Sequence, residues 1–173
     1  MATHILQCLM QGDLVTLYPL EEKHRDEMYL AASDPLIWEQ HPSHDRWKKE
    51  VFYDFFDNAI KGNLAFAVED RSNHKVIGSS RYKLHDTEKT AVEIGWTFLA
   101  RSHWGGKWNG EMKRLMIQNA HSYFSDVLLC IGDSNLRSAR AAEKIGALLI
   151  SDPSHQLFDH RPNYLTYCIS RSK

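Results

Sequence analysis

The hydrophobic pattern changes its period near the middle of the chain, and this change limits the folds that the sequence can adopt. Apolar runs over 64–68, 76–84 and 91–99 are rich in β-formers and are separated by two short polar loops, at 70–74 and 85–89. Loops of this length join neighbouring antiparallel strands. The middle of the chain is therefore predicted to be a three-stranded meander.

Both ends of the chain add further elements to this sheet. Before the meander we expect a strand over 13–20 that stops at Pro19, a helix over 21–33 that ends at Asp34-Pro35, and an aromatic-rich helix from Ser43, as N-cap, to Lys61. After it we expect a helix with its apolar face over 112–124, a strand over 127–131, a helix over 136–145 with Gly146 at C′, and strands over 147–150 and 164–169. The fold class is thus α/β (α+β), with a βαβ-like C-terminal half.

Composition excludes several function classes. A length of 173 residues fits a single domain over 1–173. The 21 Lys+Arg residues nearly cancel the 22 Asp+Glu residues, which argues against a sequence-independent nucleic-acid binder. With neither a signal-peptide pattern nor an apolar run of membrane-spanning length, we expect a cytoplasmic protein without a membrane partner. His41 and His44 form the tightest histidine pair but lack further ligands, so no metal is expected.

The segment Arg101–Gly110 lies between a predicted strand end and a predicted helix start. Gly105 and Gly106 let the backbone come close to a ligand, because no Cβ blocks the approach. The unpaired N–H groups at the start of a helix form a local anion site that suits a diphosphate, and Lys107 adds a positive charge. An ordinary tight loop is the alternative interpretation.

Two segments together resemble the signatures of the GNAT superfamily of N-acetyltransferases. Glu93–Leu99, followed by Trp104-Gly105-Gly106 and an amphipathic helix, resembles its acetyl-CoA motif. Asp133–Gly146 resembles its second signature, which has an Asn, a Ser three residues later, and a Glu-Lys-hydrophobic-Gly ending. The opening Leu14–Leu20 with His24 resembles the RimJ/RimL-like branch, whose members acetylate protein N-termini. The resemblance covers about residues 13–170 and implies a GNAT-like sheet, mixed but mostly antiparallel, flanked by about four helices.

The resemblance implies acetyl-CoA as co-substrate and a set of residues that hold it. These residues are Phe98, Leu99, Trp104, Gly105, Gly106, Lys107, Trp108, Asn109, Gly110, Asn135 and Ser138. The phosphate loop departs from the family pattern, because Lys107 stands where a glycine is expected and Asn109 where Gly or Ala is expected. We interpret it as a variant loop in which Asn109 caps the helix and Glu111 lies near its positive end. Arg137 and Arg140 either reach the nucleotide phosphates or are ordinary exposed side chains.

Amide formation requires a base, because a primary amine is mostly ammonium at neutral pH. The resemblance makes Glu93 the candidate base, acting through water; the alternative is a strand carboxylate on the solvent face or paired with Arg81. A backbone N–H near Phe98 or Leu99 is the expected oxyanion donor. Ser138 is the expected donor to the departing sulfur, unless its hydroxyl bonds to the backbone instead.

A tyrosine that the family often places seven residues after the Asn is Ala142 in this chain. The expected activity is transfer of an acetyl group to a primary amine, and the resemblance also implies a homodimer. The alternative is a degenerate acyl-CoA-binding sensor. A Rossmann-type domain is disfavoured, because the glycine pair lacks the spaced third glycine and follows a meander.

The acceptor is left open. A protein N-terminus, an amino acid, a polyamine and an amino sugar all fit. The candidate lining residues on the acceptor side are Trp38, His41, His44, Tyr82, His155 and Arg161.

Overall fold

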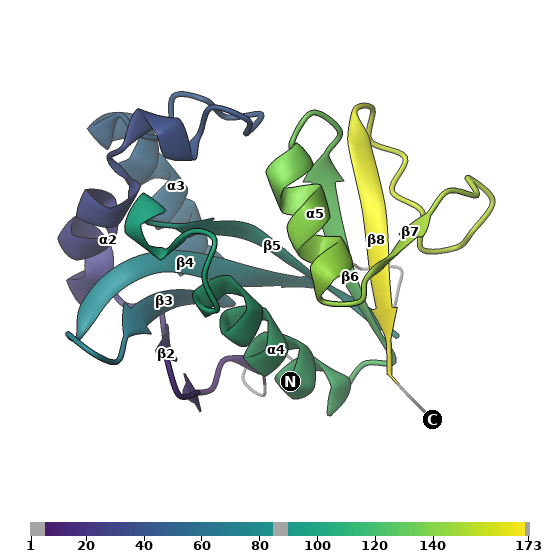
Figure 1. Ribbon diagram of the computed structural model, residues 1–173, viewed down its shortest axis with the longest axis horizontal. Helices are drawn as coiled ribbons and strands as arrows, with labels where there is room; N and C mark the ends of the chain where they lie inside the picture. The colour runs from purple at the N-terminus through teal and green to yellow at the C-terminus, as the bar shows by residue number, and fades with distance from the viewer. Residues whose placement is uncertain (1–5, 85–89, 172–173) are drawn as a thin grey trace.

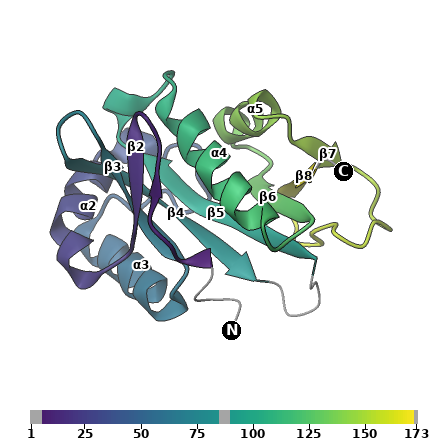
Figure 2. The same cartoon turned by 90° about the horizontal axis from the view of Figure 1, so that it is seen from below.

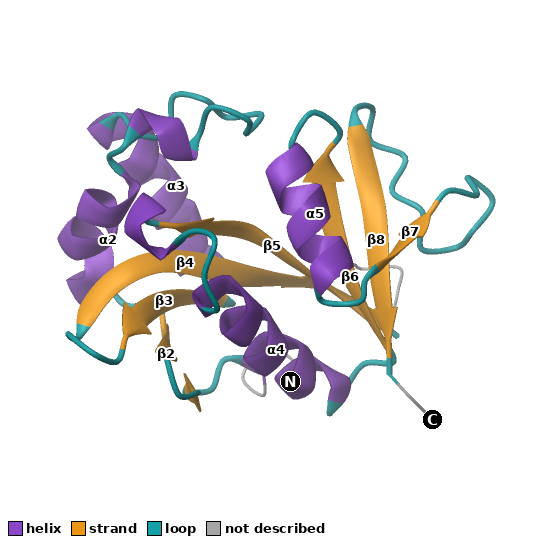
Figure 3. Cartoon of the chain, viewed as in Figure 1, coloured by secondary structure: helices purple, strands orange, loops and turns teal. Residues whose placement is uncertain are grey.

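The computed structural model describes residues 6–84 and 90–171, and it places helices on both faces of one sheet (Figures 1 and 3). The strands are β1 (Met10–Gln11), β2 (Val15–Pro19), β3 (Ala65–Asp70), β4 (Lys75–Leu84), β5 (Ala91–Leu99), β6 (Asp126–Gly132), β7 (Leu148–Ile150) and β8 (Tyr164–Ser170). The helices are α2 (Arg25–Ala32), α3 (Lys49–Gly62), α4 (Trp108–His121) and α5 (Leu136–Lys144), with 3-10 turns at Glu22–His24, Pro35–Ile37 and Arg101–His103. The strand order is β1-β2-β3-β4-β5-β6-β8-β7, so the predicted α/β fold class is confirmed.

The predicted meander is confirmed, and it contains one irregularity. Strands β3, β4 and β5 pair antiparallel in chain order; the loop predicted over 85–89 lies outside the described residues. Ser79 pairs with Phe98 and Arg81 with Gly95, so the register shifts where Ser80 faces two residues of β5. This β-bulge includes Trp96, which has a left-handed φ of 51°.

Strand β5 diverges from the next strand in the sheet. It runs parallel to β6 through only three residue pairs, the last of which is Glu93 with Leu128. Beyond that pair the two strands separate, and β6 continues on its other edge as an antiparallel partner of β8 (Figure 1). The sheet therefore contains a wedge-shaped opening that starts at Glu93.

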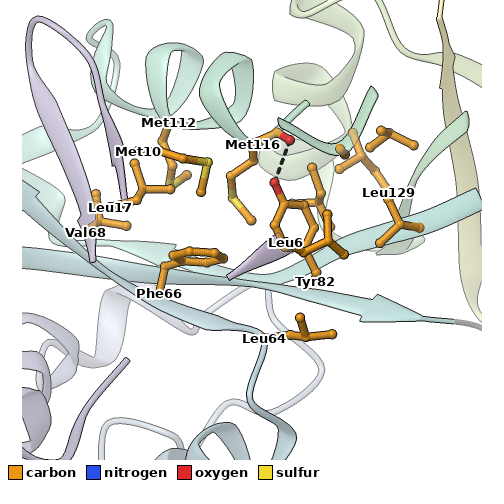
Figure 4. Close-up of a cluster of buried hydrophobic side chains, with 14 of the residues drawn as sticks. Leu6, Met10, Leu17, Leu64, Phe66, Val68, Tyr82, Met112, Met116 and Leu129 are labelled. Carbon is orange, nitrogen blue, oxygen red and sulfur yellow. Dashed lines mark hydrogen bonds between the residues drawn. The ribbon is translucent and has the colours of Figure 1, made fainter. Parts of the chain in front are cut away.

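The two faces of the sheet carry different cores. Helix α4 covers one face, where Phe66, Tyr82, Met112 and Met116 pack together with less than 2% of each side chain exposed (Figure 4). Helices α2 and α3 cover the opposite face with an aromatic cluster that includes Phe52 (Figure 2). Among residues 6–84 and 90–171, no helix is long and apolar enough to cross a membrane.

Helix α4 also ties down the start of the first long strand. The Glu111 carboxylate accepts hydrogen bonds from the backbone N–H groups of Asp13, Leu14 and Val15 at 3.0, 2.7 and 2.9 Å. Burial alone would raise the pKa of Glu111, but these three donors outweigh it and lower the pKa. Glu111 lies in the first turn of α4, as the sequence predicts, and it serves as a tertiary anchor as well.

One predicted helix start is wrong. Helix α3 begins at Lys49 instead of Ser43, because the Ser43 hydroxyl accepts a hydrogen bond from Arg46 Nη2 at 3.1 Å and does not cap a helix. The helix expected over 21–33 is confirmed, with a 3-10 first turn and an α-helical part that starts at Arg25. The predicted end of α5 is confirmed: Gly146 follows Ile145 with a φ of +87°.

Candidate active site

A cavity of about 860 Å³ opens where β5 and β6 diverge. Its walls are β5 from Ile94 onward, β6 from Leu129 onward, the segment that leads into α4, and one side of α5. The predicted coenzyme residues that line it are Phe98, Leu99, Trp104, Gly105, Gly106, Asn109, Gly110, Asn135 and Ser138. Lys107 and Trp108 do not line it. The structure thus brings together two stretches of sequence that are far apart along the chain.

The glycine pair shapes the approach to α4. Gly105 adopts a φ of +69°, which glycine reaches without strain. A Cβ on Gly106 would lie 2.5 Å from the Trp108 ring, so a side chain there would force the ring or the loop to move. Lys107 occupies the N-cap position with an ordinary φ of −88°, so it does not crowd the turn.

The first turn of α4 borders the cavity. The helix begins at Trp108, so Asn109 lies inside the helix and the prediction that it caps α4 is wrong. The N–H groups of the first turn have no intrahelical acceptor, and Asn109 and Gly110 line the cavity. The positive end of the helix dipole therefore faces the space that a ligand would fill.

The open edge of β5 supplies backbone donors. Ala100 N–H donates to Ile77 O at 2.7 Å, toward the β4 side. Because successive strand residues direct their N–H groups to opposite edges, the N–H of Leu99 is on the wedge side and that of Phe98 is on the β4 side. Of the two predicted oxyanion donors, Leu99 is therefore the one at the open edge. Its carbonyl accepts the Trp104 indole N–H at 2.9 Å.

Glu93 lies at the apex of the wedge. Its side chain is only 3% exposed, so the alternative of a strand carboxylate on the solvent face is wrong. Its cross-strand partner is Lys83 and not Arg81, with Lys83 Nζ 4.0 Å from Oε2; Arg161 Nη2 lies 3.6 Å from Oε1. Glu93 does not line the cavity itself, but a Cβ on the lining residue Gly95 would lie 3.4 Å from its Oε1. The absence of a side chain at Gly95 leaves the carboxylate next to the cavity wall.

The start of α5 forms the wall opposite β5. Asn135 is the N-cap, and its Oδ1 accepts the N–H of Ser138 at 3.2 Å. This bond leaves the amide N–H groups of Asn135 for another acceptor. The Ser138 hydroxyl has no bonded partner among the residues that the structure describes. Arg137 donates to Ile37 O at 2.9 Å and lies 3.9 Å over the Trp104 ring, so it bridges the cavity walls.

Lys113 is a site residue that the sequence analysis missed. It lines the cavity, its side chain is buried, and Nζ donates to Thr97 Oγ1 at 2.6 Å, next to the β5 bulge. Burial lowers its pKa from 10.5 to about 7. Within the described chain no carboxylate oxygen lies within 4.0 Å of Nζ. The helical spacing in the sequence could have predicted its burial, because Lys113 lies on the same face of α4 as Met116 and Ala120.

The family of the chain follows from comparison with known proteins. A family model described as the acetyltransferase (GNAT) domain matches residues 15–148. The chain belongs to this family. As a GNAT acetyltransferase it is an N-acetyltransferase, and acetyl-CoA-dependent transfer is the general activity of the family. None of the curated proteins matches the sequence.

Solved structures share the GNAT fold. A GCN5-related N-acetyltransferase from Brucella melitensis is 23% identical with a TM-score of 0.77, covering 95% of this chain and 79% of that one. The microcin C7 self-immunity acetyltransferase MccE, solved with acetyl-CoA and AMP, is 15% identical with a TM-score of 0.73, covering 92% and 94%. Spermidine N-acetyltransferase from Vibrio cholerae, solved with CoA and spermine, is 14% identical with a TM-score of 0.68, covering 92% and 96%. At these identities the likeness concerns the fold.

The acceptor side of this GNAT protein corrects several expectations. Trp38 and His41 line the cavity as predicted, and burial, aided by the charge of nearby Arg46, lowers the pKa of His41 to about 4. His41 is therefore neutral at physiological pH. The predictions for Tyr82 and His155 are wrong: Tyr82 lies in the core beneath α4, and His155 lines a separate pocket beside β7.

Two further acceptor-side candidates do not line the cavity either. His44 is exposed. Arg161 contacts Glu93 and Asp159 beside the wedge apex instead. The positive charge of Arg161 is thus already matched by two carboxylates.

Proposed function

We propose that this N-acetyltransferase binds acetyl-CoA in the cavity between β5 and β6 and transfers the acetyl group directly to a primary amine. The observation that carries the proposal is the wedge itself. One end meets the start of α4, where unpaired N–H groups favour an anion, and the other end lies next to the Glu93 carboxylate, at the lining residue Gly95. A ligand with a diphosphate at one end and a reactive thioester at the other matches this order of groups.

Binding would be divided among three elements of the chain. The loop from Trp104 to Gly110 would hold the diphosphate with backbone N–H groups. The Asn135 amide would hold a pantetheine carbonyl, because it presents N–H donors at the wedge wall. Lys113 supports the same assignment, since a buried ammonium without a carboxylate partner favours an anionic or electron-rich ligand.

The chemistry would be direct attack on the thioester. Glu93 would accept a proton from the substrate ammonium through water, which frees the nitrogen lone pair. The nitrogen attacks the carbonyl carbon, and Leu99 N–H would stabilise the oxyanion. The C–N bond forms and the C–S bond breaks. The second proton of the amine passes to the departing sulfur, assisted by the Ser138 hydroxyl, so the products are the amide and the CoA thiol. Residue 142 is alanine, so a tyrosine donor at that position plays no part.

The acceptor is part of the proposal only as a primary amine. A protein N-terminus, the acceptor of the RimJ/RimL-like branch that Leu14–Leu20 resembles, is one such amine. The cavity wall formed by Trp38, His41 and Trp96 is the side from which such an amine would approach Glu93.

A kinetic comparison of Glu93 variants tests this function. We expect Glu93→Gln to lower kcat by about 10²–10⁴-fold, the usual contribution of a general base. Its CoA affinity by calorimetry should stay close to that of the wild type, as should both properties of the control Glu50→Gln, an exposed residue of α3. If Glu93→Gln kept the kcat of the wild type across the pH range, Glu93 would not be the general base.

A second pair of variants tests the site separately from the chemistry. Asn135→Asp keeps an oxygen that can cap α5 but removes the amide N–H groups, so we expect CoA affinity to fall by about 1–3 kcal/mol. Unchanged affinity would contradict the assignment of Asn135 to the pantetheine. CoA binding without thiol release against a broad amine panel would favour the sensor over the enzyme.

A further inference from the structure

Two arginines lie behind the acceptor wall of the cavity and share one aromatic ring. The guanidinium carbons of Arg46 and Arg81 lie 4.4 and 5.3 Å from the centre of the Phe55 ring. Arg46 also lies 5.2 Å over Trp38, and Arg81 lies 4.9 Å over Trp96. We call Arg46 and Arg81 the arginine pair. Because Trp38 and Trp96 line the cavity, the pair directly contacts its wall.

The arginine pair has polar groups that nothing in the described chain satisfies. Arg46 Nη1 and Arg81 Nε and Nη2 are buried without a hydrogen-bond partner. The one side-chain bond is that of Arg46 Nη2 to Ser43 Oγ at 3.1 Å. No carboxylate oxygen of the described residues lies within 4.0 Å of either guanidinium. Buried unpaired donors are costly, and more so when the group is charged, so a retained pair points to a missing partner.

The charges of the pair also oppose each other. The pKa of each arginine is lowered to about 10, by burial in both cases and, for Arg81, also by the positive charge of Arg46. The charge of Asp45 offsets only part of the burial of Arg46, and Glu93 and Asp159 both contact Arg161 instead of the pair. An anion bound by both guanidinium groups would satisfy their donors and reduce the repulsion between them.

The position of the pair relates it to the acceptor. Arg81 is the cross-strand partner of Gly95, and Gly95 separates the Glu93 carboxylate from the cavity. The pair is thus on the same face of the sheet as the candidate base, next to the place where an amine would be deprotonated. The coenzyme donors on α4, including Lys113, lie on the opposite face.

We propose that the arginine pair binds an anionic group of the acceptor, so that the substrate is a primary amine that also carries a carboxylate or a phosphate. This inference rests on the proposed function and names its substrate class. Arginine suits both anions, because its planar fork of donors matches carboxylate and phosphate oxygens. A polyamine is disfavoured, since it would bring further positive charge to two unpaired cations.

Matched pairs of amines test the substrate class. Initial rates of acetyl-CoA consumption are measured for alanine against alaninamide, and for phosphoethanolamine and glucosamine 6-phosphate against ethanolamine and glucosamine, with spermidine as a cationic amine. We expect kcat/KM to favour the anionic member by about tenfold to a hundredfold, the scale of one charge-assisted hydrogen bond. The carboxylate and phosphate arms identify which anion the site prefers. Equal or better rates for the neutral amines or spermidine would overturn the inference.

Variants of the pair show whether these arginines cause the preference. Arg81→Met and Arg46→Met should raise KM for the anionic amine and abolish the preference, while CoA affinity stays unchanged. Arg81→Lys should retain part of the preference, and the control Arg114→Met, an exposed residue of α4, should retain all of it. A preference that survives in both methionine variants would exclude the pair.

A binding measurement separates this inference from the proposed function. N-acetylalanine and N-acetylalaninamide, and the corresponding pair from phosphoethanolamine and ethanolamine, are titrated into the protein saturated with CoA. Selective binding of the anionic member, lost in Arg81→Met, supports the anion subsite even where no transfer is detected, an outcome that contradicts only the proposed transfer. Transfer without any preference for anionic amines contradicts only the subsite.

Discussion

Arg81 and Tyr82 are consecutive residues of β4, but their side chains enter opposite faces of the sheet and very different surroundings. The Tyr82 hydroxyl donates to Met116 O at 2.6 Å and accepts from Asn119 Nδ2 at 3.4 Å, so it is fully bonded within the core beneath α4 (Figure 4). Arg81 lies between aromatic rings on the sheet face that α3 covers. Its buried Nε and Nη2 atoms donate no hydrogen bond to any described residue.

The comparison distinguishes two reasons for burying a polar group. A polar group whose hydrogen bonds are completed by the chain stabilises the fold, and its removal leaves its partners unpaired. A charged group that stays unpaired lowers stability, and a ligand is the simplest physical explanation for its presence. The first kind should therefore respond to mutation in unfolding experiments and the second kind in binding or kinetic experiments.

The largest expected effect is on the bonded side. Tyr82→Ala should lower the free energy of unfolding by about 3–5 kcal/mol, because it leaves a large cavity in the core. Tyr82→Phe should lower it by about 1–3 kcal/mol, because it removes the two buried hydrogen bonds of the hydroxyl, while Asn119 Nδ2 keeps its bond to Leu6 O. Urea denaturation measures both, with Tyr123→Phe, whose residue is 52% exposed, as the unaffected control. A free energy of unfolding for Tyr82→Phe equal to that of the wild type would contradict this distinction between Tyr82 and Arg81.

An intermediate effect is expected at Lys113, which is buried but only partly bonded. Its pKa falls from 10.5 to about 7 on folding, so the unfolded chain binds its proton more tightly than the folded protein. Stability should therefore rise with pH from about 7 to about 10 and be lost again as the pH falls toward 7. Lys113→Met should remove this part of the slope. Urea titration at several pH values measures this slope. If the wild type and Lys113→Met showed the same pH dependence of the free energy of unfolding, burial would not shift the pKa of Lys113.

The smallest effect on stability is expected at Arg81. Arg81→Met should change the free energy of unfolding by less than about 1 kcal/mol, because lost cation–π contacts of about that size are offset by relief of the unpaired donors. The same urea titration measures it. A loss as large as that of Tyr82→Phe would instead place Arg81 among the residues that hold the fold.

Local patterns in the sequence were sufficient to predict most elements of the fold. The meander, α5 and its glycine end follow from hydrophobic period and turn chemistry, which depend on neighbouring residues. The resemblance to GNAT signatures adds the positions of Asn135 and Gly105, and both line the cavity.

The remaining features depend on contacts between distant segments. The bulge at Trp96 arises from the register against β4, which no local pattern encodes. Helix α3 starts late because Arg46 turns back onto Phe55, and the arginine pair itself exists only because β4 and the segment before α3 meet there. At Asn109 the residue type is typical of a helix cap, but the helix already begins at Trp108.

The strand order at the far side of the sheet has a consequence for how the protein reaches its native state. β8 lies between β6 and β7 in the sheet but follows both in the chain. Neither β6 nor β7 can therefore pair with β8 until this last strand is in place. Until then β6 has an unpaired outer edge, a known template for association with other chains. The late, non-local step that seals this edge also fixes one wall of the cavity, so maturation of the site and protection from aggregation should proceed together.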